Sequence, residues 1–154
     1  MANTFINGNA DLPNYLNKDL PPGDWVDVTQ DMIDKFAEIS GDHQWIHVDV
    51  ERSRKESPYG TTIAHGYLTL SLRAQLRATA MDMPPARIGI NYGLNKVRFT
   101  GPVPAGSRVR AVLRLTALDQ LPENGVLMTW LATVYRDGSD KPVLVAETLG
   151  RRFE

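Results

Sequence analysis

The sequence of 154 residues contains no cysteine. This absence excludes disulfides, cysteine nucleophiles and cysteine metal sites, and it is compatible with a reducing compartment. The sequence also has no run of about 18 apolar residues, so no membrane span is predicted. The polar N-terminal stretch has neither the basic nor the apolar region of a secretory signal, and we therefore expect a cytoplasmic protein.

Neither sign of charge dominates, because 17 basic and 18 acidic residues leave a formal net charge of −1. No global basic field exists to hold nucleic acid or an anionic membrane, and neither partner is predicted. The phosphate-binding patterns G-x-x-x-x-G-K-[ST] and G-x-G-x-x-G are missing as well. With 42% apolar residues, the chain is long enough to form one globular domain with a sizeable core.

Two helices are predicted, after an N-terminal segment without regular patterns. Residues 1–24 are rich in Asn, Asp, Pro and Gly, which is typical of an irregular arm with one turn; we assign residues 25–154 to the domain. Apolar residues at helical spacing predict a helix over 30–40, and Thr29 is the candidate N-cap. A longer helix over 64–81 is apolar over most of its girth and is therefore expected to be largely buried.

The second half of the chain changes to a period of two, which is typical of strands. Alternation continues through Val109, Ala111, Leu113, Leu115 and Ala117, which predicts a half-buried antiparallel strand. The predicted strands cover residues 25–28, 88–99, 109–117, 126–134 and 143–153. This order predicts an α+β fold in which a meander sheet wraps against one central helix.

Asp42 and His47 are the first candidate catalytic residues. They follow the helix that ends at Gly41, in a segment with little regular pattern. A carboxylate and an imidazole five residues apart in a loop can converge on one water, and histidine exchanges a proton near neutral pH. The spacing alone has little specificity, since an Asp after a helix is commonly a turn residue.

Gly66 and its neighbours form the second candidate site, at the start of the long helix. Backbone N–H groups and the positive end of the helix dipole gather there, and a glycine permits close approach by a ligand. The Gly66 N–H could therefore bind a carbonyl oxygen that gains negative charge. Alternatively, Gly66 only relieves packing. We interpret His65 as a structural residue.

Other side chains give weaker signals. No metal site is predicted, because Gly41 and the β-prone pair Trp45-Ile46 argue against a helix that would place His43 and His47 on one face. Ser71 has no nucleophile elbow around it, which argues against a serine hydrolase. A local basic set is mostly typical of a solvated strand face, and some members could hold the phosphates of a cofactor tail: Lys96, Arg98, Arg108, Arg110 and Arg114.

Together these motifs resemble a known family. The blocks GDHQWIHVD, from Gly41, and YGTTIAHGYL, from Tyr59, resemble the hydratase motif of the MaoC-like dehydratases, the (R)-specific enoyl-CoA hydratases. NYGLNKVRF, from Asn91, followed by PVPAGS, from Pro102, resembles the nodulation protein N subgroup. The blocks occur in the family's order and spacing, which makes them more specific together than the Asp–His pair alone.

The resemblance implies a hot-dog fold, in which an antiparallel sheet curls round a central helix, and normally a homodimer or a higher homo-oligomer. It implies a trans-2-enoyl-CoA substrate and an (R)-3-hydroxyacyl-CoA product, with coenzyme A as part of the substrate and no metal or other cofactor. It further implies that Asp42 and His47 are catalytic, that Gly66 donates to the oxyanion, and that Tyr67 and Ser71 lie near the site. Lys96 and Arg98 are candidates for the coenzyme A phosphates.

Two departures and three alternatives accompany this hypothesis. Gln44-Trp45 stands where many family members carry Asn-Pro, and Ala74 stands where some hydratases carry a serine. These differences leave the accepted acyl chain length open. The alternatives are a hot-dog acyl-CoA thioesterase, a non-catalytic acyl-thioester binding protein and a structural dimerisation module.

Overall fold

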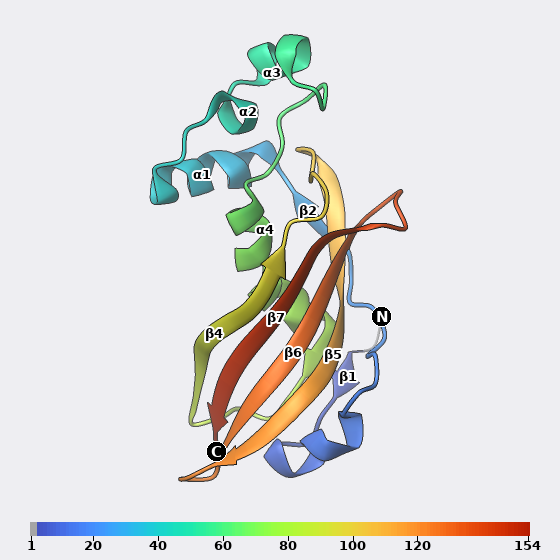
Figure 1. Ribbon diagram of the computed structural model, residues 1–154, viewed down its shortest axis with the longest axis vertical. Coiled ribbons are helices and arrows are strands. Elements are labelled where there is room, and N and C mark those ends of the chain that lie inside the picture. Colours follow the sequence, from blue (N-terminus) through green and yellow to red (C-terminus); the bar gives the residue numbers. More distant parts are fainter. Residues whose placement is uncertain (1–2) are drawn as a thin grey trace.

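A curled five-stranded sheet forms the largest part of the computed structural model, which describes residues 3–154 (Figure 1). The strand order is β2-β5-β6-β7-β4, and all neighbours are antiparallel. The strands are β2 (Val26–Val28), β4 (Ile88–Arg98), β5 (Ser107–Leu121), β6 (Gly125–Arg136) and β7 (Pro142–Phe153). Strands β5, β6 and β7 form a meander as predicted, and β2 lies at the edge beside β5. The prediction was wrong for β4, which pairs with β7 at the other edge instead of with its sequence neighbour β5.

The alternating pattern of β5 explains how the sheet buries one face. Val109, Ala111, Leu113 and Leu115 are fully buried, as their alternation predicted. The pairing of β5 with β6 shifts between Leu115 and Ala117, and such an irregularity interrupts the regular alternation of a strand. Ala117 was predicted to face inward, but after this shift it is only partly buried.

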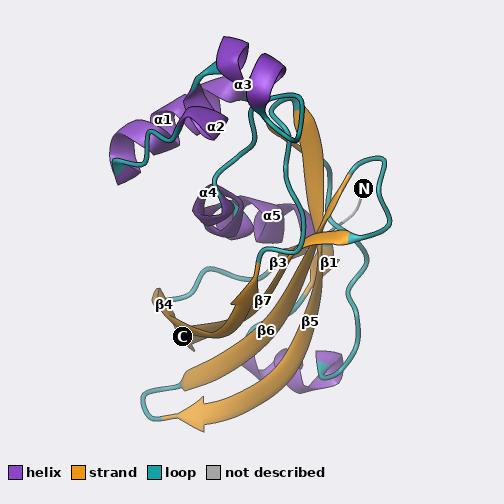
Figure 2. Ribbon diagram, turned by 45° about the horizontal axis from the view of Figure 1, so that its top comes forward, coloured by secondary structure: helices purple, strands orange, loops and turns teal. Residues whose placement is uncertain are grey.

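The central helix is divided into α4 (Gly66–Ser71) and α5 (Arg73–Ala80). The predicted single helix over 64–81 was therefore too long at both ends, and a turn at Leu72 interrupts it. The Leu72 N–H still donates to Leu68 O at 2.9 Å, and the Leu76 N–H donates to Leu72 O at 2.9 Å. Because hydrogen bonding continues through the turn, α4 and α5 stay close to one axis and together cross the concave face of the sheet (Figure 2).

One side of this helix pair is exposed, so the prediction of a largely buried helix was wrong for the single chain. Tyr67, Ser71, Ala74 and Ala78 recur at spacings of three and four residues and are exposed. Apolar and small residues suggested burial all round the helix. The sheet, however, curls round only part of it, and that geometry cannot be read from residue types (Figure 2).

Three further helices connect β2 to the central helix. They are α1 (Gln30–Ser40), α2 (Trp45–Val48) and α3 (Val50–Glu56). The predicted cap is confirmed, since the Thr29 hydroxyl accepts from the Met32 N–H at 3.2 Å. The helical turn of α2 was not predicted from its β-prone residues. Tertiary hydrogen bonds hold it, because the Trp45 and Ile46 carbonyls accept from Ser53 and Ile63.

The described part of the N-terminal segment contains a short strand and a short helix that the pattern did not predict. Strand β1 (Thr4–Phe5) pairs in parallel with β3 (Met81–Asp82), and η1 (Asn9–Tyr15) is a 3-10 helix. Ile6 and Leu12 are fully buried in the core. The boundary after residue 24 stays a prediction. Among the described residues, no helix has the length and apolar character needed to cross a membrane.

Candidate active site

His47 lies on α2 and is almost fully buried, with 7% of its surface exposed. Its Nδ1 lies 2.7 Å from the carbonyl oxygen of Ile63. Because a carbonyl can only accept, Nδ1 carries the proton in the neutral ring, and Nε2 presents a lone pair. Burial is the main cause that lowers the pKa of His47 below its usual value, so the ring is neutral near pH 7.

The backbone carbonyl of His47 is held by Gln30 of α1, whose side chain is in turn held by Thr62. The amide nitrogen of Gln30 donates to His47 O at 2.7 Å, and the Thr62 hydroxyl donates to Gln30 Oε1 at 2.5 Å. These bonds fix α2 relative to the N-terminal end of α1. Sequence reasoning missed Gln30 and Thr62, since no local motif marks two residues that meet only in the folded chain.

Asp42 follows the helix terminator Gly41, whose φ of 80° is the left-handed conformation that glycine adopts readily. Its carboxylate is exposed, and Oδ1 accepts from the Gln44 N–H at 3.2 Å. The backbone oxygen of Asp42 accepts from His65 Nε2 at 3.0 Å. The chain therefore uses a short turn and a contact to a distant histidine to hold this carboxylate.

His65 connects the two predicted catalytic residues. Its ring is 3% exposed and stacks on the His47 ring at a centroid distance of 3.9 Å and an angle of 24°. Since Nε2 donates to Asp42 O, Nδ1 holds the lone pair, and it is buried without a hydrogen-bond partner. The prediction of a structural role agrees with these contacts, but it did not name Asp42 and His47 as the partners. Its position next to Gly66 in the second motif was the available signal.

Asp42, His47 and His65 could together hold a metal ion. Each offers one ligand atom, and these atoms lie within 4.8 Å of one another. One nitrogen of each ring is committed to a backbone carbonyl, which leaves one lone pair per imidazole. The same arrangement can hold a water molecule between a carboxylate and a neutral imidazole. His43 is exposed and does not belong to this cluster.

Gly66 and His47 line the same cavity, which has a volume of about 410 Å³. Gly66 is the first residue of α4, where a backbone N–H has no acceptor within the helix. A Cβ atom at this position would lie 2.9 Å from Cγ of Phe99, so the ring packs closely against the glycine backbone. A neutral imidazole and a helical N–H group thus converge on one space that is large enough for part of a small molecule.

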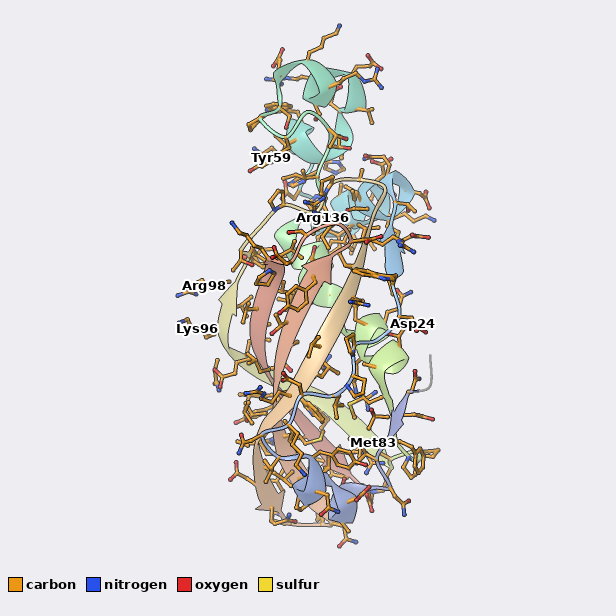
Figure 3. All side chains as sticks on the ribbon, turned by 90° about the vertical axis from the view of Figure 1, so that its right-hand side faces the viewer. Asp24, Tyr59, Met83, Lys96, Arg98 and Arg136 are labelled. Atoms are coloured by element: carbon orange, nitrogen blue, oxygen red, sulfur yellow. The ribbon has the colours of Figure 1, made fainter. Side chains whose placement is uncertain are left out.

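The residues that line this cavity do not include the other predicted site residues, which are Asp42, Tyr67, Ser71, Lys96 and Arg98. Tyr67 is 69% exposed and meets Phe99 edge to face. The Ser71 hydroxyl donates to Tyr67 O at 2.7 Å, and Ser71 lines a neighbouring cavity. Lys96 and Arg98 are exposed on edge strand β4 and point away from the sheet (Figure 3).

The remaining basic residues are largely neutralised or stacked. Arg108 forms an ion pair with Asp137 at 2.5 Å, and Arg114 forms one with Asp19 at 2.8 Å. The guanidinium of Arg110 lies over the Trp25 ring at 4.3 Å. Most of these basic residues therefore lie on a solvated strand face, as the sequence favoured.

Comparison with known proteins places this geometry in a family. Residues 13–131 match the family model described as MaoC like domain. A 3-hydroxyacyl-thioester dehydratase Z from Mycobacterium tuberculosis is 46% identical over 142 residues, which cover 92% of this chain and 93% of that protein. Nodulation protein N from Rhizobium leguminosarum bv. viciae is 41% identical over 138 residues, which cover 89% and 86% of the two proteins.

Solved structures agree with this result. An unliganded (R)-hydratase from Pseudomonas aeruginosa matches with a TM-score of 0.68 and 25% identity, over 90% of this chain and 82% of that one. The likeness confirms the predicted α+β hot-dog fold, and the relatives support a hydro-lyase activity. The family model and the two relatives together establish that the chain belongs to the MaoC-like dehydratase family.

Proposed function

We propose that this protein is an (R)-specific enoyl-CoA hydratase that reversibly adds water to a trans-2-enoyl-CoA and forms (R)-3-hydroxyacyl-CoA. The hydrogen bond from His47 Nδ1 to Ile63 O carries the proposal, because it leaves Nε2 as a proton acceptor in a lowered-pKa ring. The relatives named as dehydratases and as an (R)-hydratase support the same reaction class.

In the proposed mechanism, Asp42 and His47 hold one water over the C2–C3 double bond. His47 Nε2 removes a proton as the water oxygen bonds to C3, and the electron pair of the double bond moves toward the thioester. The proton held by this pair is then returned to C2 on the same face, with Asp42 sharing the proton transfers, so that His47 is neutral again. The net result is addition of H and OH across one double bond, without a redox step.

Gly66 stabilises the charge that develops on the thioester oxygen. Gly66 lines the cavity beside His47, and its N–H belongs to a helix start, where negative charge is favoured. Loss of one oxyanion donor typically lowers the rate about a hundredfold or more. In this proposal Tyr67 and Ser71 lie near the bound substrate. Lys96 and Arg98 bind the phosphates of coenzyme A.

The proposed reaction needs no metal or redox cofactor, since proton transfer by Asp42 and His47 is sufficient. It is placed in the cytoplasm, where the coenzyme A substrate would be made and consumed.

A homodimer or higher homo-oligomer is also part of the proposal. Ile88 and Tyr92 on edge strand β4 are 47% and 51% exposed. An exposed apolar edge strand can pair with a second chain, and the exposed helix side next to it extends the surface. Light scattering after size exclusion should give at least twice the mass of one chain; a monomer would refute this part.

The test of the reaction is hydration of crotonyl-CoA by the purified protein. Loss of the conjugated thioester absorbance, with (R)-3-hydroxybutyryl-CoA as product and no free thiol, would establish the hydratase. Release of free thiol would favour the thioesterase, and binding without turnover would favour a binding protein. The variant His43→Gln is a matched control for His47→Gln, because His43 is an exposed imidazole outside the cluster.

A further inference from the structure

Three cavities lie along one side of the central helix. Residues of α4 and α5 that line them recur at spacings of three and four, and so share a helix face: Gly66, Thr69, Leu70, Arg73, Ala74 and Arg77. The cavities have volumes of about 410, 300 and 390 Å³ in order from His47. This face therefore carries a series of spaces that begins at the candidate active site.

The opposite wall of these cavities is made by β4 and β7. The lining on β4 moves from Leu94 in the second cavity to Ile90 in the third, and on β7 it moves from Leu149 to Arg152. The second and third cavities share Arg73, Ala74 and Asn91, so they adjoin. The cavities thus follow the helix and both strands in the same direction, away from His47.

The middle cavity has an apolar lining that suits a hydrocarbon chain. Leu70 and Ala74 contribute from the helix, while Leu94 and Leu149 contribute from the strands. A polar pantetheine arm would gain little from these side chains, whereas an acyl chain would bury its methylene groups there. The lining therefore indicates that the acyl chain of the thioester, and not its pantetheine arm, extends from His47 into the middle cavity.

The far cavity has a different character, because four arginines line it: Arg73, Arg77, Arg151 and Arg152. Asp82 is the one acidic residue among its described lining residues. Arg152 is satisfied by Glu154, Asn9 and the Pro84 carbonyl. The far cavity is thus basic and adjoins the middle cavity, whose lining is mostly apolar.

One of these arginines, Arg73, has no carboxylate partner in the described part of the chain. Asp82 lies close enough to Arg77 for their charges to interact, and Nε of Arg73 and of Arg151 is buried without a hydrogen-bond partner. Burial lowers the pKa of Arg73 to about 10 and also lowers the pKa of Arg77. A partly buried guanidinium without a carboxylate partner is costly, as at Arg73, so this cluster is suited to an anion that arrives with a ligand.

We infer that the arginine-lined cavity binds an anionic group at the far end of the acyl chain, so that the preferred substrates are trans-2-enoyl thioesters with an ω-carboxylate. The inference rests on the proposed function, which places the thioester carbonyl at Gly66. Along the helix, Arg73 lies about 10 Å and Arg77 about 16 Å beyond Gly66 at about 1.5 Å per residue. An extended chain advances about 1.2 Å per bond, so about eight bonds reach the level of Arg73 and about thirteen reach that of Arg77.

The experiment compares trans-2-decenedioyl-CoA with trans-2-decenoyl-CoA, which differ in the terminal carboxylate. The wild-type enzyme should show a higher kcat/KM for the dicarboxylic substrate. In Arg77→Met and Arg73→Met this preference should fall about tenfold to a hundredfold, as expected for a lost charged hydrogen bond. Arg54→Met is the matched control, because Arg54 is exposed on α3.

The outcomes separate this inference from the proposed function. Two outcomes would overturn the inference alone. In one, the enzyme hydrates decenoyl-CoA but shows no preference for the dicarboxylic substrate. In the other, both arginine variants retain the preference. Hydration of neither substrate, nor of crotonyl-CoA, would overturn both. N-acetylcysteamine thioesters of the same acids lack the phosphates of coenzyme A. If the arginine variants impair only coenzyme A thioesters, the anion bound is a phosphate and the acyl assignment is wrong.

Discussion

Replacing His65 with leucine removes a buried side chain that contacts both proposed catalytic residues. The change deletes the hydrogen bond to Asp42 O and the stacking on His47. A lost hydrogen bond that leaves a partly buried carbonyl unpaired costs about 1–3 kcal/mol. For a chain of this size, each kcal/mol lowers Tm by about 2–4 °C, so we expect a loss of about 2–12 °C. Displacement of Asp42 and His47 should also lower kcat for crotonyl-CoA by about tenfold to a hundredfold.

His65→Gln distinguishes positioning from packing, because its amide can still donate toward Asp42 O and should restore most of kcat. Burial is the largest cause that lowers the pKa of His47, and the charge of His65 adds to it. Both variants should therefore move the acid limb of kcat/KM upward, toward pH 6.5. Phe36→Leu is the packing control, since Phe36 lies 5.0 Å from the His65 ring. If Phe36→Leu lowers kcat equally, or if the acid limb of His65→Leu does not move, the reasoning is refuted.

Further predictions concern the pair itself and one helix cap. His47→Gln and Asp42→Asn should each lower kcat about 10²- to 10⁴-fold with little loss of Tm; near-normal rates in both would contradict their assignment. Since burial lowers the pKa of folded His47, the unfolded state binds its proton first on acidification, and both kcat/KM and the free energy of unfolding should fall below about pH 6.5. An acid limb above that value would contradict the neutral base. Dialysis against EDTA should leave kcat unchanged, whereas a loss that Zn²⁺ restores would make the Asp42–His47–His65 cluster a metal site. Thr29→Ala removes the cap of α1 and should cost about 1 kcal/mol in chemical denaturation.

Local patterns were sufficient to predict the strands of the five-stranded sheet and the first helix. Strict alternation predicted the buried face of β5 up to Leu115, and the Thr29 cap with Gly41 predicted the limits of α1. Both features depend on residues close together in the chain. The shift after Leu115 and the turn at Leu72 instead depend on how the sheet curls round the helix, which no local pattern contains.

The candidate site also contains features that local patterns predict and features that depend on the fold. Asp42, His47 and Gly66 lie in two recognisable motifs, and the family resemblance assigned their roles before the fold was known. The contacts that orient them join residues distant in sequence, such as Gln30 with His47 and His65 with Asp42, 17 and 23 positions apart. Only the fold reveals these contacts, because residue type alone does not distinguish a buried glutamine or histidine from an exposed one.

The departure Gln44-Trp45 has a physical explanation in the backbone. Trp45 is the first residue of α2, a position where proline is favoured because its N–H has no helical acceptor. Gln44 has φ −55° and ψ 138°, an extended conformation that a following proline also imposes. The Asn-Pro of the family therefore fits the same path, and here the Arg52 guanidinium lies 4.2 Å from the Trp45 ring and covers it. Because the candidate site is oriented through carbonyls of Asp42, His47 and Ile63, this exchange of side chains leaves the geometry of the proposed catalytic pair in place.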